Sequence, residues 1–175
     1  VNSGSLKKNI LLKYGVLKPE AMVESALKQV LILERLGFYD IIVSLKSPDV
    51  LLTIKANRLM SQKVDYPLHI GITEAGIGDE SSFISAMGVG ILLLEGIGDT
   101  IRVSLSYRDR ARNIIAGRKI LESLGYELVE MAHTRESALC CGGGGGLKTN
   151  QPELSNEIAK IRIMEAKEVG VAKLV

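Results

Sequence analysis

The sequence has no tryptophan, few other aromatic residues and no long apolar run. Aromatic side chains make up 4% of its 175 residues, so the core must consist of aliphatic side chains. No apolar run approaches the ~20 residues that a membrane-spanning helix requires, and we expect no membrane partner. The formal net charge is only +2. No basic stripe is interleaved with aromatic residues, so a nucleic-acid partner is not expected either.

Cysteine is also scarce. The chain has only Cys140 and Cys141, which are adjacent. Adjacent cysteines do not readily bond to each other, since a vicinal disulfide strains the peptide between them. Without a disulfide framework, we expect a reducing, cytoplasmic compartment. Two thiolates on one glycine-rich turn can instead face a metal or a cluster, which takes about four ligands. The motif therefore indicates a kind of site and leaves its ligand set incomplete.

The glycine run 142–146 matches neither of the common phosphate-binding loops. Leu147 shifts the register of a P-loop and replaces the last glycine of a dinucleotide-binding loop. Two interpretations remain open. Successive N–H groups ahead of a helix can hold an anion, or the run is a flexible surface loop.

Apolar, strand-like runs alternate with longer helical patterns along the chain. The expected strands are 38–45, 68–73, 100–105 and 126–131, with a last one at 171–175. The expected helices are 19–37, 47–62, 81–95, 110–124 and 150–169, with Ser47 as one N-cap and Asn150 with Glu153 as a capping box. This order predicts an α/β fold of parallel βα units. In such folds the chemistry lies beyond the carboxyl ends of the strands.

Polar side chains gather where the expected strands end. These residues are Asn2, Ser44, Lys46, Thr73, Glu74, Arg102 and Ser104. Two cations with neutral donors suit a phosphate or a diphosphate, and a carboxylate beside them can act as an acid or a base or can hold the cations in place. The alternative is that they are solvated loop residues and salt bridges.

Four stretches in this order, VNSGSL, VSLKSPDV, HIGITEAG and EGIGDTIRVSL, resemble the 4-hydroxy-3-methylbut-2-enyl diphosphate synthase family. The resemblance runs to about residue 125 and implies the C-terminal half of a TIM barrel. It implies isoprenoid synthesis by reductive ring opening of methylerythritol cyclodiphosphate, with electrons from flavodoxin or ferredoxin through a 4Fe-4S cluster. The resemblance also implies substrate-binding and catalytic residues. Substrate binding falls to Asn2, Lys46, Thr73, Arg102 and Ser104, and catalysis to Glu74.

From about residue 126 to 175 the sequence resembles the cysteine-rich CCG domain of heterodisulfide reductases and of the iron–sulfur proteins of glycolate and lactate oxidation. This resemblance implies that Cys140 and Cys141 ligate an iron–sulfur cluster, in a tail of βα(β) form. In that family an upstream cysteine and a Cys-x-x-Cys complete the ligands, and this sequence has neither. Either two chains supply four thiolates at a symmetric interface, or the cysteines are relics. His133 is a further candidate ligand.

Three functions remain open from the sequence. The first is the isoprenoid-pathway enzyme or a part of it, and the second is an electron-transfer module of the heterodisulfide reductase type. The third is a non-catalytic fusion or fragment. A half-barrel leaves open strand edges, which favours a homodimer. His69 lies within an expected strand, and we interpret it as a hydrogen-bonded core histidine.

Overall fold

The computed structural model describes residues 1–73, 76, 79–105 and 111–170. The chain divides into two compact units, Val1–Tyr126 and Glu127–Leu174. None of the helices in the described ranges is long and apolar enough to cross a membrane. The predicted strand at 171–175 lies outside the described residues. The division of function between 1–125 and 126–175 stays a prediction.

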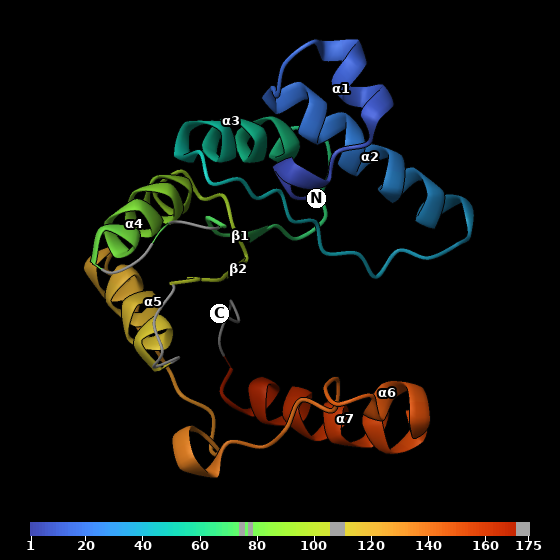
Figure 1. Cartoon of the computed structure of the whole chain (residues 1–175). Coiled ribbons are helices and arrows are strands. Elements are labelled where there is room, and N and C mark those ends of the chain that lie inside the picture. The colour runs from blue at the N-terminus through green and yellow to red at the C-terminus, as the bar shows by residue number, and fades with distance from the viewer. Residues whose placement is uncertain (74–75, 77–78, 106–110, 171–175) are drawn as a thin grey trace. The chain divides into compact units, whose positions relative to one another are not determined.

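The first unit alternates helices with short stretches of extended chain. Its helices are α1 (Lys8–Tyr14), α2 (Pro19–Arg35), α3 (Val50–Ser61), α4 (Asp79–Leu94) and α5 (Ala111–Ser123), and a 3-10 turn covers Ser3–Ser5. The strands are β1 (His69–Ile70) and β2 (Thr100–Ile101). Each of the five helices packs against the next. Figure 1 shows α2 to α5 following one another around the outer side of the strands.

Four extended stretches pair in sequence order, and every pair is parallel. Asn2 bridges Lys46, Val43 bridges Leu68, and β1 pairs with β2 through His69 and Thr100. Main-chain bonds continue the ladder, as the Lys46 N–H donates to the Val1 oxygen at 3.0 Å and the Arg102 N–H to the Ile70 oxygen at 2.9 Å. This parallel order confirms the α/β class.

The stretches have one apolar side and one polar side, because successive side chains of an extended chain point in opposite directions. Val43, Leu45, Ile70, Ile72 and Val103 are buried. The residues between them are polar or glycine. The apolar side meets the helices in an aliphatic core. Its fully buried members include Met22 of α2, Met60 of α3, Leu92 of α4, and Leu45 and Ile70 of the extended stretches.

The predicted strands were too long, and one was wrong. Within 38–45 only Val43 joins the ladder. Side chains such as Tyr39 and Ile42 are exposed, so burial does not hold the rest of this stretch in a sheet. The region 126–131 forms no strand, since Val129 is exposed and has no paired neighbour. Without a buried side, an apolar stretch of this length has little to hold it in a sheet. The CCG-type segment is therefore helical and loop-like in its described part, and the expected βα(β) order is corrected.

The helices begin and end close to the predicted residues, with two corrections at their N-caps. Asp49, and not Ser47, caps α3 by accepting a 2.9 Å hydrogen bond from the Leu52 N–H. Ser47 is buried and its hydroxyl accepts from the Asp49 N–H. At the last helix, α7 (Pro152–Glu168), the N-cap is Gln151, so the capping box of Asn150 with Glu153 is wrong.

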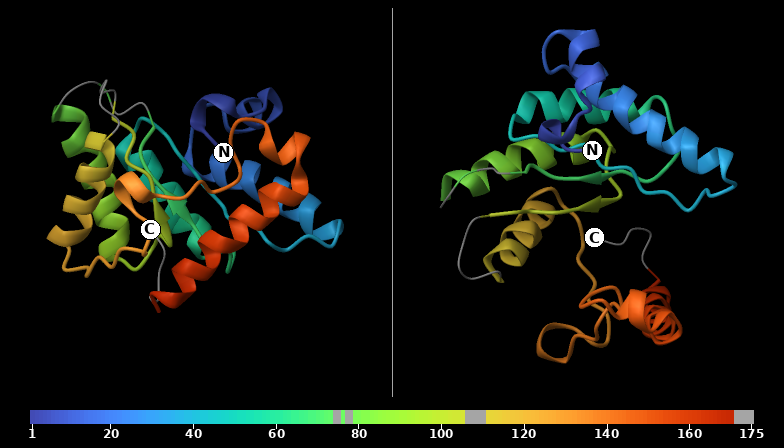
Figure 2. Two further views of the ribbon diagram at one scale, coloured as in Figure 1. Left: turned by 90° about the horizontal axis from the view of Figure 1, so that it is seen from below. Right: turned by 45° about the vertical axis from the view of Figure 1, so that its right-hand side comes forward.

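The second unit combines a long loop with the helices α6 (Leu147–Asn150) and α7, and a 3-10 turn covers Arg135–Ser137. The loop is attached to α7 at two points. The Ser155 hydroxyl donates to the Gly142 oxygen at 2.7 Å, and Arg162 donates to the His133 oxygen at 2.9 Å. Figure 2 shows the loop running beside α7 in both views.

Asn57 connects α3 to the sheet and offers a test of this core. Its buried amide donates to the Leu45 oxygen at 3.0 Å and to the Thr53 oxygen at 2.9 Å. We expect Asn57→Ala to lower the free energy of unfolding by about 1–3 kcal/mol, because the Leu45 oxygen loses its partner. Urea unfolding followed by circular dichroism measures this change. Lys55→Ala, on the exposed side of the same helix, is the control, and equal midpoints for the two variants would contradict the assignment.

Candidate functional site

Parallel register brings four residues of the polar side into one row, which we call the cationic row: Asn2, Lys46, Gly71 and Arg102. Asn2 pairs directly with Lys46. Lys46 and Gly71 each lie three residues after the bridged pair Val43 and Leu68, so they are at the same level. Gly71 and Arg102 each lie two residues after the paired His69 and Thr100, so they are level too. The row therefore joins residues that are up to a hundred positions apart in the sequence.

Lys46 and Arg102 place two positive charges in this row. Lys46 is half-buried and Arg102 is exposed. Burial lowers the pKa of the Lys46 ammonium, and the nearby Arg102 guanidinium lowers it further. Neither cation forms an ion pair with a carboxylate among the residues that the structure describes. Two neighbouring cations without an acidic partner in this part of the chain favour a bound anion.

Gly71 allows the extended stretches that carry Gly71 and Arg102 to lie close together. A Cβ at this position would lie 2.4 Å from the main-chain oxygen of Arg102 and 3.6 Å from Cε of Lys46. The first distance is far below a normal contact, so a side chain here would push the two stretches apart. The absence of a side chain also leaves the space beside the Lys46 stem open. Sequence reasoning missed Gly71, although its place between His69 and Thr73 on one side of a strand was a usable signal.

Thr73 and Ser104 stand two residues beyond Gly71 and Arg102 on the same side, and both are half-buried. The Thr73 N–H donates to the Ser47 oxygen at 3.4 Å, which links the end of this extended stretch to the turn before α3. The two hydroxyls thus follow the cationic row toward the carboxyl ends of the strands. Glu74, the predicted catalytic residue, lies outside the described residues.

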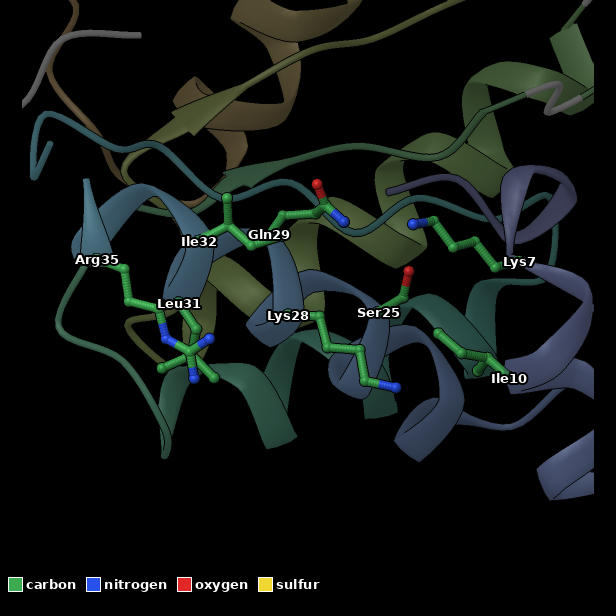
Figure 3. A pocket seen from close by; sticks show the side chains of 8 residues that line it. All are labelled: Lys7, Ile10, Ser25, Lys28, Gln29, Leu31, Ile32 and Arg35. Atoms are coloured by element: carbon green, nitrogen blue, oxygen red, sulfur yellow. The ribbon is translucent and has the colours of Figure 1, made fainter.

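A pocket of ≈ 280 Å³ lies elsewhere, along α2. Figure 3 shows Lys7, Lys28 and Arg35 around it, together with apolar side chains such as Ile10 and Ile32. Lys28 forms an ion pair with Glu24 at 2.6 Å. None of the predicted site residues lines this pocket, so it is not the anion site.

In the second unit, Cys140 and Cys141 are free and exposed thiols on the loop before α6. The Gly142 N–H donates to Sγ of Cys140 at 3.4 Å. Gly142 has a φ of 79°, and a Cβ there would lie 2.4 Å from the Ser155 oxygen. Only glycine adopts this conformation against α7 without strain. The cysteine pair is therefore held at one end by a fixed point of the loop.

His133 does not join the cysteines as a ligand in the described residues. Its Nδ1 contacts the Glu165 carboxylate, which also accepts from Arg162 at 2.5 Å. The hydrogen bond from His133, and then that from Arg162, hold the pKa of Glu165 below its usual range. Glu165 is buried. The contacts among His133, Arg162 and Glu165 thus attach the loop to α7.

The donor set does not fit a complete iron–sulfur cluster. A 4Fe-4S cluster takes about four thiolates, and the sequence contains two. Across the described ranges, no group of three or more His, Cys, Asp or Glu side chains is placed to hold a metal ion. The chain therefore offers half of a ligand set at most.

Comparison with known proteins adds the family. Residues 1–118 match the family described as the GcpE TIM-barrel domain, and residues 108–175 match the cysteine-rich domain CCG. The fold and the cationic row define an α/β protein with two neighbouring cations on the polar side of a parallel sheet. The chain belongs to the GcpE TIM-barrel domain family. Both resemblances predicted from the motifs are thus confirmed.

Three relatives carry the name 4-hydroxy-3-methylbut-2-en-1-yl diphosphate synthase (flavodoxin). The protein of Caldanaerobacter subterraneus subsp. tengcongensis is 60% identical over 125 residues, covering 71% of this chain and 35% of the relative. That of Clostridium perfringens is 54% identical over 126 residues, covering 72% and 36%. That of Clostridium acetobutylicum is 43% identical over 172 residues, covering 98% and 48%. The chain thus spans between about a third and a half of the length of these relatives.

We expect Gly71→Ala to lower the free energy of unfolding by about 1–3 kcal/mol, because the new methyl group must displace the Arg102 main chain. Gly90→Ala is the matched control. Gly90 lies within α4, where a Cβ meets nothing within 4 Å, and alanine there is expected to be neutral or mildly stabilising. Urea unfolding of both variants measures the difference. An equal loss of unfolding free energy in both variants, or no loss in Gly71→Ala, would contradict the close contact between Gly71 and the Arg102 main chain.

Proposed function

We propose that this chain is the diphosphate-binding part of a 4-hydroxy-3-methylbut-2-en-1-yl diphosphate synthase of isoprenoid synthesis. In this proposal, it forms half of a TIM barrel and binds methylerythritol cyclodiphosphate for reductive ring opening. The observation that carries the proposal is the cationic row, where Lys46 and Arg102 lie near each other without an acidic partner among the described residues. The names of the relatives support it.

The roles follow from the chemistry of each side chain. Lys46 supplies a compact ammonium and Arg102 a planar fork of donors, which together neutralise a diphosphate. Asn2, beside Lys46, and the hydroxyls of Thr73 and Ser104 supply neutral hydrogen bonds that orient the substrate. We assign Glu74 to proton transfer, on the family resemblance of the motif that contains it.

The proposal includes the setting of the reaction. The electron donor would be flavodoxin or ferredoxin, and a 4Fe-4S cluster would have to take at least half of its thiolate ligands from outside this chain. The protein works in the cytoplasm and forms a homodimer. Exposed apolar side chains on the outer helices, such as Leu36 after α2 and Ile114 on α5, support self-association.

Binding of the cyclic diphosphate tests the proposal directly. We expect Lys46→Ala and Arg102→Ala each to weaken binding of methylerythritol cyclodiphosphate by about 10- to 100-fold, because each removes a charge-assisted contact. Isothermal titration calorimetry on the whole chain measures the affinity, and circular dichroism checks the fold. Lys55→Ala removes an exposed lysine from α3 and serves as the control. Binding that is unchanged in both site variants would sink the proposal.

The CCG match favours a second candidate, an electron-transfer module of the heterodisulfide reductase type. Because about four thiolates are needed per cluster, two chains must share one. We then expect about one cluster per two chains after anaerobic reconstitution, measured as iron and acid-labile sulfide. The double variant Cys140→Ser, Cys141→Ser should bind none. Iron that persists in the double variant, or no iron in the parent chain, would exclude this candidate.

A further inference from the structure

A second row lies on the polar side of the sheet, which we call the histidine row: Ser44, His69 and Thr100. Each member precedes a member of the cationic row by two residues. The pairs Val43–Leu68 and His69–Thr100 bring the three side by side. Because side chains two apart on an extended chain share a side, the histidine row borders the cationic row. The proposed function assigns no role to the histidine row.

His69 has a hydrogen-bond partner in each neighbour of the histidine row. Thr100 fixes the ring, because its Oγ1 lies 2.7 Å from Nδ1. Ser44 fixes only the main chain, because its hydroxyl donates to the His69 main-chain oxygen at 2.7 Å. The side chain is half-buried. Since Nδ1 is engaged with Thr100, Nε2 is the nitrogen that remains for another partner.

The charges around His69 disfavour a proton on its ring. Burial lowers the pKa of the imidazole, and the positive charges of Lys46 and Arg102 lower it further. These are the charged groups that act on the ring from the two stretches on either side, among the described residues. His69 is therefore less readily protonated than a free imidazole.

A bound diphosphate changes this balance. Its negative charge cancels the repulsion from Lys46 and Arg102 and attracts a protonated imidazole. We propose that His69 takes up a proton from solvent when a diphosphate binds between Lys46 and Arg102, and so becomes a third cation of the anion site. This inference rests on the proposed function. By linkage, ligand affinity must then rise as the pH falls toward the region where the bound form is protonated.

The chain suits a direct test, because it has only two histidines, His69 and His133. Carbon–proton NMR of the imidazole Cε1 groups reports the protonation of each ring, and His133→Asn assigns the two signals. We expect saturating inorganic pyrophosphate to move the His69 titration midpoint to higher pH. The signal of His133, whose ring contacts Glu165, serves as the internal reference.

Calorimetry with the same probe provides the second readout. His69→Asn keeps a hydrogen-bonding group near the position of Nδ1 and cannot titrate. We expect it to weaken pyrophosphate binding by about fivefold at pH 6.5, the size of one partly exposed charge contact, and by less at pH 8.5. The protonation of pyrophosphate itself is common to both proteins and cancels in this comparison.

The outcomes separate the inference from the function on which it rests. If pyrophosphate binds in a Lys46-dependent way and the His69 titration does not move, the inference is wrong and the proposed function stands. If pyrophosphate and the cyclic diphosphate both fail to bind the whole chain, both fall. A shifted His69 titration together with a pH-dependent loss in His69→Asn supports the inference.

Discussion

The site depends on the parallel register of four extended stretches. Asn2, Lys46, Gly71 and Arg102 come from separate βα units, and only this pairing brings them into one row. A slip of one residue in any stretch would turn its polar side toward the helices and its apolar side toward the ligand. The aliphatic core therefore fixes the site: burying Leu45 and Ile70 is what holds Lys46 and Gly71 on the opposite side.

This division of sides is unusual for parallel strands and has an electrostatic cost. Parallel sheets are normally apolar on both faces. Here one side carries two cations, and both the Lys46 ammonium and the His69 ring are less readily protonated than usual. A protein that places like charges together gains stability from a bound anion. The repulsion between these charges is thus the physical reason for expecting an anion there.

The sequence predicted the helices more accurately than the strands. Pro19 at the start of α2 and the positive-φ glycines Gly37, Gly125 and Gly170 mark helix ends by local backbone preference. The strands depended on pairing partners that a local pattern does not contain, so 126–131 looked like a strand and forms none. The same limit applies to side chains. Lys46 and Arg102 were identified from their places at strand ends, whereas the Gly71 contact and the Thr100 partner of His69 require the register.

Two of the 18 glycines show how the chain places reactive groups in both units. A Cβ on Gly71 or on Gly142 would lie 2.4 Å from a main-chain oxygen, that of Arg102 in one case and of Ser155 in the other. Each glycine adjoins a candidate site residue, Lys46 or Cys141, and lets one main chain lie against another. The two sites nevertheless differ in completeness. Anion binding needs only donors that one unit already holds, whereas a cluster needs about twice the thiolates present. Of the two proposed properties, diphosphate binding therefore requires only donors of this chain, and electron transfer requires another set of ligands.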